Sequence, residues 1–177
     1  MADIGQYLDK AIAEALPFMI EARRALHAIP ELAFEETRTA EYVARTLTEL
    51  GYTPVCGEVG TSVTALLDSG RPGPYIMLRA DMDGLPVSEE TGLPFASTHK
   101  GRMHACGHDG HMAMLLGAAK VLRSMKERLN GKILLLFQPA EEAAPFGGSP
   151  LMIKDGILDN PKVDMMFGMH LWPDLPY

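Results

Sequence analysis

GKILLLFQPAEE, residues 131–142, has the pattern of a buried strand followed directly by acidic residues. Its apolar run from Ile133 to Phe137 has no polar interruption, which is typical of a strand covered on both faces. Pro139 ends the run, and the acidic pair Glu141 and Glu142 follows it. Open α/β sheets bind ligands outside the carboxyl ends of their strands. The stretch therefore predicts a central strand that delivers two carboxylates to a binding edge.

Helical and extended patterns alternate on both sides of this strand. Helices are expected over residues 9–31, 36–52, 112–129 and part of 150–163, and further strands over 61–68, 74–83 and 164–173. Pro17 is expected to bend or restart the first helix. The last strand, DMMFGMHLWP, has the apolar character of a buried strand. This alternation predicts an α/β fold, with a mainly parallel sheet flanked by helices.

Composition excludes several classes of function. The 177 residues carry a net charge of −7 and contain no Lys/Arg-rich run, so nucleic acid is not an expected partner. No apolar stretch is long enough to predict a membrane span, and the N-terminal stretch lacks the pattern of a secretory signal. Cys56 and Cys106 cannot form a disulfide framework. We therefore expect a cytoplasmic protein with free thiols.

Further polar residues gather at other predicted strand ends. Asp81 and Asp83 close the strand 74–83, and His170 lies near the end of the strand 164–173. Cys106 and His108 lie two positions apart in a segment whose glycines argue against a helix. In an irregular loop, that spacing can direct both side chains toward one centre. Thiolate, imidazole and carboxylate are all ligands for zinc and related divalent metals.

Each of these features alone has an ordinary interpretation: a solvated acidic turn, a hydrogen-bonded core histidine, or a small buried cysteine. A thiol hydrolase is another alternative, with Cys106 as nucleophile and His104 or His108 as base. That alternative leaves the acidic residues of PAEE and ADMD without a role. The combined pattern therefore favours a metal site.

Four motifs in this order resemble one known family: LRADMDGLPV at 78–87, MHACGHDGHMAMLLGAA at 103–119, LLFQPAEE at 135–142 and FGMHLWP at 167–173. They resemble the amidohydrolase branch of the co-catalytic metallopeptidases, which includes hippurate hydrolase, N-acyl-amino-acid amidohydrolases and plant indole-acetyl-amino-acid hydrolases. The resemblance implies a zinc-exopeptidase-like catalytic domain that hydrolyses the amide bond of small N-acyl amino acids. It also implies one or two divalent ions (Mn, Zn, Ni or Co) and a homo-oligomer.

The resemblance also implies roles for individual residues. The residues that match the metal ligands of the family are Cys106, His108, Glu142 and His170. Glu141 matches the general base. Asp83 matches a catalytic-site residue that supports the ligand two places before it, although Asp81 stands here where relatives have histidine. Three nearby residues are expected to contact ligands rather than the metal: His104, Asp109 and His111.

Members of this family are much longer than this chain and continue into a lid or dimerisation domain, which the resemblance does not reach. We therefore expect residues 1–177 to form the N-terminal part of the catalytic domain, with no second domain. A further histidine ligand of the family has no counterpart in these motifs. The isolated chain is expected to bind at most one ion and to lack useful amidase activity. The alternative is a non-catalytic metal-binding domain.

Overall fold

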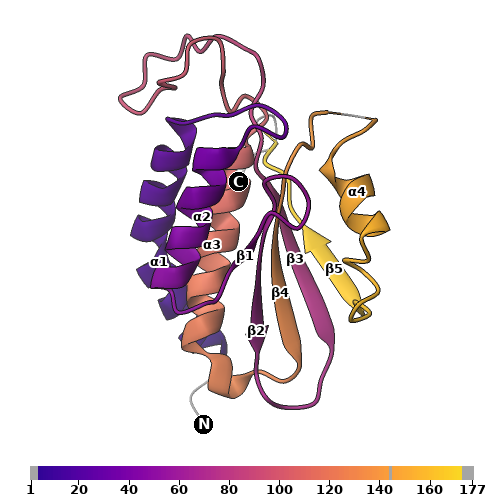
Figure 1. Ribbon diagram of the computed structural model, residues 1–177. Coiled ribbons are helices and arrows are strands. Elements are labelled where there is room, and N and C mark those ends of the chain that lie inside the picture. Colours follow the sequence, from indigo (N-terminus) through magenta and orange to yellow (C-terminus); the bar gives the residue numbers. More distant parts are fainter. Residues whose placement is uncertain (1–3, 144, 173–177) are drawn as a thin grey trace.

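A five-stranded mixed sheet organises the computed structural model, which describes residues 4–143 and 145–172 (Figure 1). The strands are β1 Val55–Cys56, β2 Val63–Asp68, β3 Tyr75–Asp81, β4 Lys132–Gln138 and β5 Met165–Gly168, in the order β1-β2-β4-β3-β5. β3 runs parallel to both β4 and β5, whereas β2 is antiparallel to β4 and to β1. The expected α/β class is confirmed, and the parallel part contains the strands whose ends carry the polar residues.

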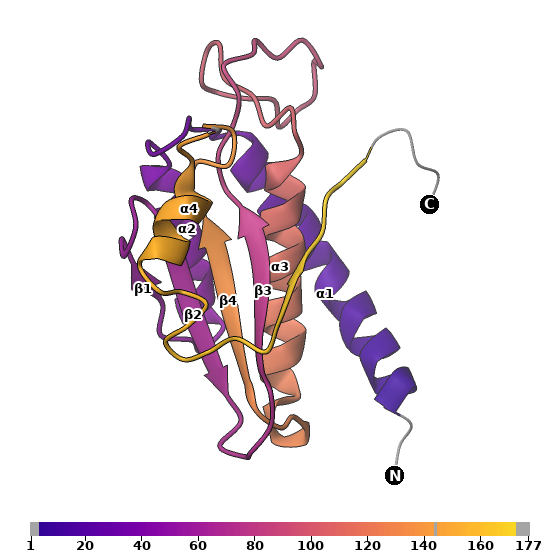
Figure 2. The same ribbon diagram turned by 90° about the vertical axis from the view of Figure 1, so that its right-hand side faces the viewer.

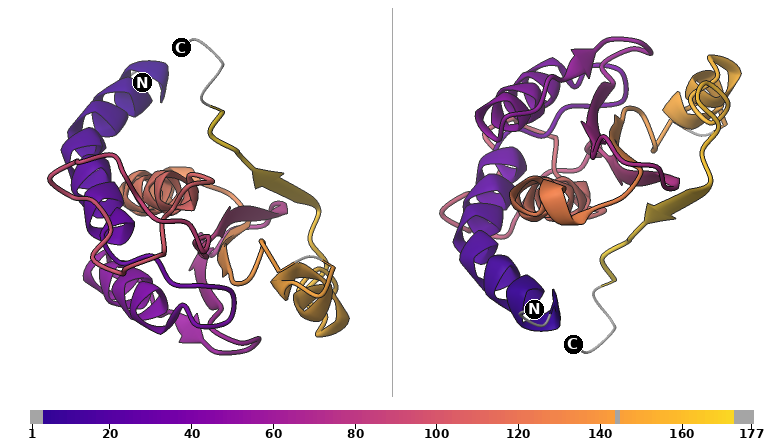
Figure 3. Two further views of the ribbon diagram at one scale, coloured as in Figure 1. Left: turned by 90° about the horizontal axis from the view of Figure 1, so that it is seen from above. Right: turned by 90° about the horizontal axis from the view of Figure 1, so that it is seen from below.

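Helices cover the two faces of this sheet unequally. α1 Ile4–His27, α2 Thr37–Glu49 and α3 His108–Ser124 lie on one face, and the short α4 Gly148–Lys154 lies on the other (Figures 1 and 3). A 3₁₀ turn, Lys126–Arg128, follows α3. None of the helices in the described ranges combines the length and apolar character that a membrane crossing needs.

The apolar run of β4 packs on both faces, as its sequence predicts. Leu135 and Phe137 belong to the main core, under α1, α2 and α3. Leu134 and Leu136 belong to a smaller core with Met77 and Met152, beneath α4. Because successive side chains of a strand point to opposite faces, an unbroken apolar run is what such a position requires.

Two helices differ from expectation. α1 continues through the exposed Pro17, so the helix does not restart there. α3 begins at His108 and includes Gly110, where an irregular loop was expected. A Cβ at Gly110 would lie 2.3 Å from Cδ1 of Leu171, so this glycine permits close packing rather than ending a helix. Gly107, just before α3, has a φ of +86°.

The expected burial of the last strand is also wrong. Every residue of β5 is exposed, and Phe167 retains 53% of its accessible surface. Within the described ranges β5 pairs with β3 alone, so one of its edges is open (Figure 2). An apolar sequence shows that a strand is suited to burial, but it cannot show which neighbours cover it.

Candidate metal centre

The ends of three parallel strands meet beside the start of α3. Asp81 is the last residue of β3, Glu141 and Glu142 follow β4, and His170 lies two residues beyond β5. Since β3, β4 and β5 run in the same direction, their carboxyl ends share one edge of the sheet. His108, the first residue of α3, lies at the same edge and is 1% exposed.

His108 is the common member of the groups that could hold a metal ion. Its Nε2 lies 3.8 Å from Oε1 of Glu142 and 3.9 Å from Oε2 of Glu141. Ligand atoms of Cys106, His108 and His170 all lie within 4.8 Å of one another. In the group of Cys106, His108 and His170, Sγ of Cys106 lies 3.4 Å from Nε2 of His170. These two groups share His108 and together offer a thiol, two imidazoles and two carboxylates, and a third group joins Asp81 and His111 to His108.

The donor set fits a divalent cation. Nε2 of His108 and Oε1 of Glu142 are buried and have no hydrogen-bond partner within the described part of the chain. Leaving such groups unsatisfied is costly unless something else binds them. Two ligands placed about 2.0–2.3 Å from one tetrahedral ion lie about 3.3–3.8 Å apart, close to the distances found here.

Asp83 holds the other side of His108. Its Oδ1 lies 3.3 Å from Nδ1 of His108, and its Oδ2 accepts a hydrogen bond of 2.9 Å from the backbone N–H of Glu142. A carboxylate behind an imidazole fixes the ring so that the opposite nitrogen faces the metal. Asp83 thus contacts His108 and the backbone of Glu142, and these contacts do not involve Asp81, the residue two places before it.

Asp81 belongs to a neighbouring network. Its Oδ1 accepts a hydrogen bond of 2.6 Å from Nδ1 of His111, and Nε2 of His111 accepts one of 2.9 Å from the backbone N–H of Leu171. Arg79, which the sequence analysis missed, donates to Asp81 at 2.8 Å and to Gln138 at 3.0 Å. His111 therefore links the end of β3 to the residue that follows His170, and its Nε2 lone pair is already engaged.

The remaining polar residues of the motif lie against α1. Oδ2 of Asp109 contacts Nδ1 of His27 at 2.9 Å and accepts from Nε of Arg23 at 3.2 Å. His104 is buried, and this burial lowers its pKa to about 4, so the ring is neutral. Neither Asp109 nor His104 belongs to a metal-binding group among the residues described.

Burial and charge shape the acidity of the cluster in opposite ways. Burial raises the pKa of the Cys106 thiol to about 12, with Glu142, Glu141 and Asp81 adding to the effect. Burial also opposes protonation of His108, but Asp83, Asp81 and Glu142 outweigh it and raise the pKa of His108. An excess of negative charge around a half-buried thiol is an environment that a bound cation would relieve.

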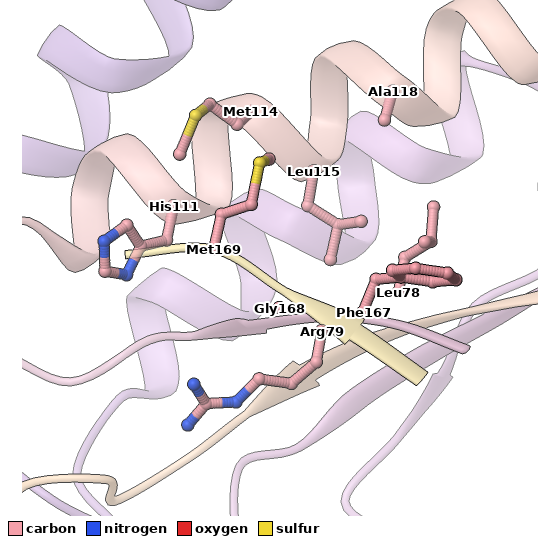
Figure 4. A pocket seen from close by; sticks show the side chains of 9 residues that line it. All are labelled: Leu78, Arg79, His111, Met114, Leu115, Ala118, Phe167, Gly168 and Met169. Carbon is pink, nitrogen blue, oxygen red and sulfur yellow. The ribbon is translucent and has the colours of Figure 1, made fainter. Parts of the chain in front are cut away.

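A cavity of about 300 Å³ lies beside the cluster, between α3, β3 and β5 (Figure 4). Its walls are mainly apolar, from Leu78, Leu115, Phe167 and Met169, and it shares His111 and Arg79 with the Asp81 network. The cavity is therefore a feature of the open β5 edge rather than the site of the ligand cluster.

The fold and the cluster together place the chain among metal-binding α/β domains. Residues 77–177 match the model of peptidase family M20/M25/M40, and the chain belongs to this family. The N-acyl-L-amino acid amidohydrolase of Geobacillus stearothermophilus is 45% identical over 168 residues, which cover 95% of this chain and 45% of that protein. Thermostable carboxypeptidase 1 of Saccharolobus solfataricus is 44% identical over 176 residues, 98% of this chain and 44% of that protein.

A solved structure shows the same fold. The YXEP protein of Bacillus subtilis, described as a dinuclear metal-binding peptidase, superposes with a TM-score of 0.86 at 41% identity. The superposition covers 93% of this chain and 45% of that one. The chain thus spans about 45% of the length of the relatives it matches. The resemblance drawn from the four motifs is confirmed at the level of the family.

Proposed function

We propose that this chain carries the metal-binding part of a site that hydrolyses the amide bond of N-acyl amino acids such as hippurate. The supporting observation is that His108, whose buried Nε2 has no hydrogen-bond partner in the described ranges, is shared by two candidate ligand groups, one with Cys106 and His170 and one with Glu141 and Glu142. Relatives named as amidohydrolases and carboxypeptidases act on the same kind of bond, carbon to nitrogen. On this proposal residues 1–177 form the N-terminal part of the catalytic domain, in a homo-oligomer when complete.

In the proposed site, Cys106, His108, Glu142 and His170 hold the ion, which is Zn, Mn, Ni or Co. A bound divalent cation would supply Lewis-acid activation of water and of the scissile carbonyl. Asp83 keeps the His108 ring in place through its contact with Nδ1. The same Asp83 carboxylate accepts a hydrogen bond from the backbone N–H of Glu142, and so it also holds the backbone of this second proposed ligand.

Glu141 is the proposed general base. Its side chain is 42% exposed, against 24% for Glu142, so it is the more accessible of the two carboxylates to water and substrate. Glu141 would take a proton from water and return it to the leaving amine. In this proposal Glu142 binds the metal inside the cluster, and Glu141 acts as the general base at its rim.

The thiol-hydrolase alternative receives less support. A cysteine nucleophile needs a lowered pKa, usually from a cationic neighbour. Burial and the acidic neighbours raise the pKa of Cys106 instead. Metal binding, which deprotonates a coordinating thiol, is the use that fits this environment.

The test is a metal analysis of the purified 177-residue chain beside Cys106→Ser, with Cys56→Ser as the control. Cys56 is exposed on β1, away from the cluster. We expect about one ion per chain in the unmodified protein and in Cys56→Ser, and a clear loss in Cys106→Ser. Full occupancy in Cys106→Ser would contradict the ligand assignment.

The same preparation separates an enzyme from a non-catalytic metal-binding domain. Hydrolysis of hippurate or N-acetyl-methionine would be assayed with Mn²⁺ added, before and after chelation. We expect one bound ion without useful turnover, because the four proposed ligands would suffice for one tetrahedral ion and not for two. A chain that binds two ions and turns over substrate would require a further ligand from Asp81, Asp83, His104 or His111.

A further inference from the structure

Glu36 is a buried carboxylate far from the ligand cluster in sequence. It directly precedes α2 and has no exposed surface. Its Oε1 accepts a hydrogen bond of 2.8 Å from the backbone N–H of Ala140, and its Oε2 accepts a short one from the hydroxyl of Thr61. A buried carboxylate costs free energy unless its hydrogen bonds are made, so these contacts are its main compensation.

The turn that Glu36 holds is a constrained one. Ala140 lies between β4 and Glu141 and has a φ of +53°, in the left-handed region that residues with a Cβ seldom adopt. On the other side of the turn, Gly148 donates a hydrogen bond of 3.1 Å to the carbonyl of Ala140. A Cβ at Gly147 would lie 2.3 Å from that same oxygen, so α4 begins in close contact with the turn.

Two buried carboxylates thus hold alternate amides of the acidic segment. The N–H of Ala140 donates to Glu36, and the N–H of Glu142 donates to Asp83 at 2.9 Å. Glu141 lies between these two anchored amides. The direction of both glutamate side chains therefore depends on a backbone that Glu36 and Asp83 fix from opposite ends.

We propose that Glu36 is a positioning residue that holds the Pro139–Ala140 turn so that Glu141 and Glu142 face His108. The inference rests on the proposed metal centre, because it assigns Glu36 a purpose through Glu142. Glu36 itself lies outside the ligand groups found among the described residues. Its effect is on the geometry of the turn.

Glu31 provides a matched control in the same segment. It is 7% exposed, and its Oε2 accepts hydrogen bonds of 2.9 Å from both the N–H and the hydroxyl of Thr39, in the first turn of α2. Its side chain thus satisfies the start of a helix and, among the described residues, forms no hydrogen bond or ion pair with the acidic turn. Loss of this carboxylate removes a buried anchor of α2 without touching Ala140.

The experiment compares Glu36→Ala, Glu36→Gln and Glu31→Ala in the full 177-residue chain. Zn²⁺ affinity is measured by titration calorimetry, and exchange of the Ala140 amide is followed by NMR. We expect Glu36→Ala to weaken Zn²⁺ binding about 10–100-fold and to speed Ala140 exchange. Glu36→Gln should restore both, because its amide oxygen can accept from Ala140 while its NH₂ donates to Thr61. Glu31→Ala should lower stability but keep the Zn²⁺ affinity of the unmodified chain.

Three results would overturn the inference: unchanged Zn²⁺ affinity in folded Glu36→Ala, unchanged Ala140 exchange in the same variant, or an equal loss of affinity in Glu31→Ala. If Glu36→Ala does not fold, Thr61→Val tests the same point by removing one partner of the carboxylate. Faster Ala140 exchange is then expected, and unchanged exchange counts against the inference. If the unmodified chain binds no Zn²⁺, the proposed metal centre fails, while Ala140 exchange still decides the role of Glu36.

Discussion

Cys106 is the residue whose chemistry depends most on what surrounds it. With its pKa raised to about 12, about one thiol in ten thousand is ionised at pH 8. In chelator-treated protein we expect iodoacetamide to modify the exposed Cys56 first and Cys106 far more slowly. Mass spectrometry of a time course would measure both rates, and Cys56→Ser would isolate the slower one. Equal rates at the two cysteines would revive the thiol-hydrolase interpretation.

Glu141 and Glu142 are adjacent in sequence but are expected to respond differently to the same substitution. Glu142→Gln should remove the bound metal, since its buried Oε1 faces His108 at 3.8 Å. Glu141→Gln should leave the metal content nearly unchanged. In a complete enzyme, Glu141→Gln should reduce hydrolysis about 10²–10⁴-fold, the usual cost of losing a general base. Metal analysis of both variants checks the pair, and full occupancy in Glu142→Gln would remove it from the ligand set.

At the scale of elements, the turn that precedes β4 requires a glycine at position 131. Gly131 has a φ of +81°, and a Cβ there would lie 2.1 Å from the carbonyl oxygen of Pro74. Gly70 has a φ of +73° but open space around it. Gly131→Ala should therefore destabilise the protein by about 2–3 kcal/mol, against about 1 kcal/mol for Gly70→Ala. Urea unfolding of both variants measures the difference, and equal costs would mean that β4 can shift away from Pro74.

The strands and helices were largely predictable because their patterns are local. The apolar run of β4 identifies both its conformation and its burial on two faces. The start of α3 was not predicted because Gly110 is needed for close packing against Leu171, which comes from another part of the chain. The insertion of β4 between β2 and β3 is likewise a pairing of distant segments, which no local pattern contains.

The candidate site divides in the same way. Polar residues at the end of an apolar strand or just beyond it, such as Asp81 and Glu142, could be assigned to one edge of the sheet from sequence. Arg79 and Glu36 could not be recognised, since their importance comes from partners on other elements. Arg79 does alternate with Asp81 along β3, which places both side chains on one face, and this is the signal that could have found it.

For the whole molecule, the open edge at β5 predicts association. Met165 and Phe167 of β5, and Met169 just beyond it, are 48–66% exposed, and within the described ranges β5 is paired on one side. An exposed apolar edge is a template for pairing with another chain. Sedimentation velocity over a range of concentrations should show self-association that Phe167→Lys reduces. Phe146→Lys, on a loop away from this edge, is the control because Phe146 is 82% exposed. A monomer at all concentrations would contradict the prediction.

The spread of the cluster along the chain also has a consequence for synthesis. Cys106 and His170 are 64 residues apart, and Glu36 binds an amide 104 residues further along. A ribosome releases these segments in order, so a nascent chain that ends before Glu142 presents two of the proposed ligands, Cys106 and His108. The ion therefore cannot guide the early helices and strands during translation. With the proposed ligands, the ion would be bound only after β5 and His170 have emerged.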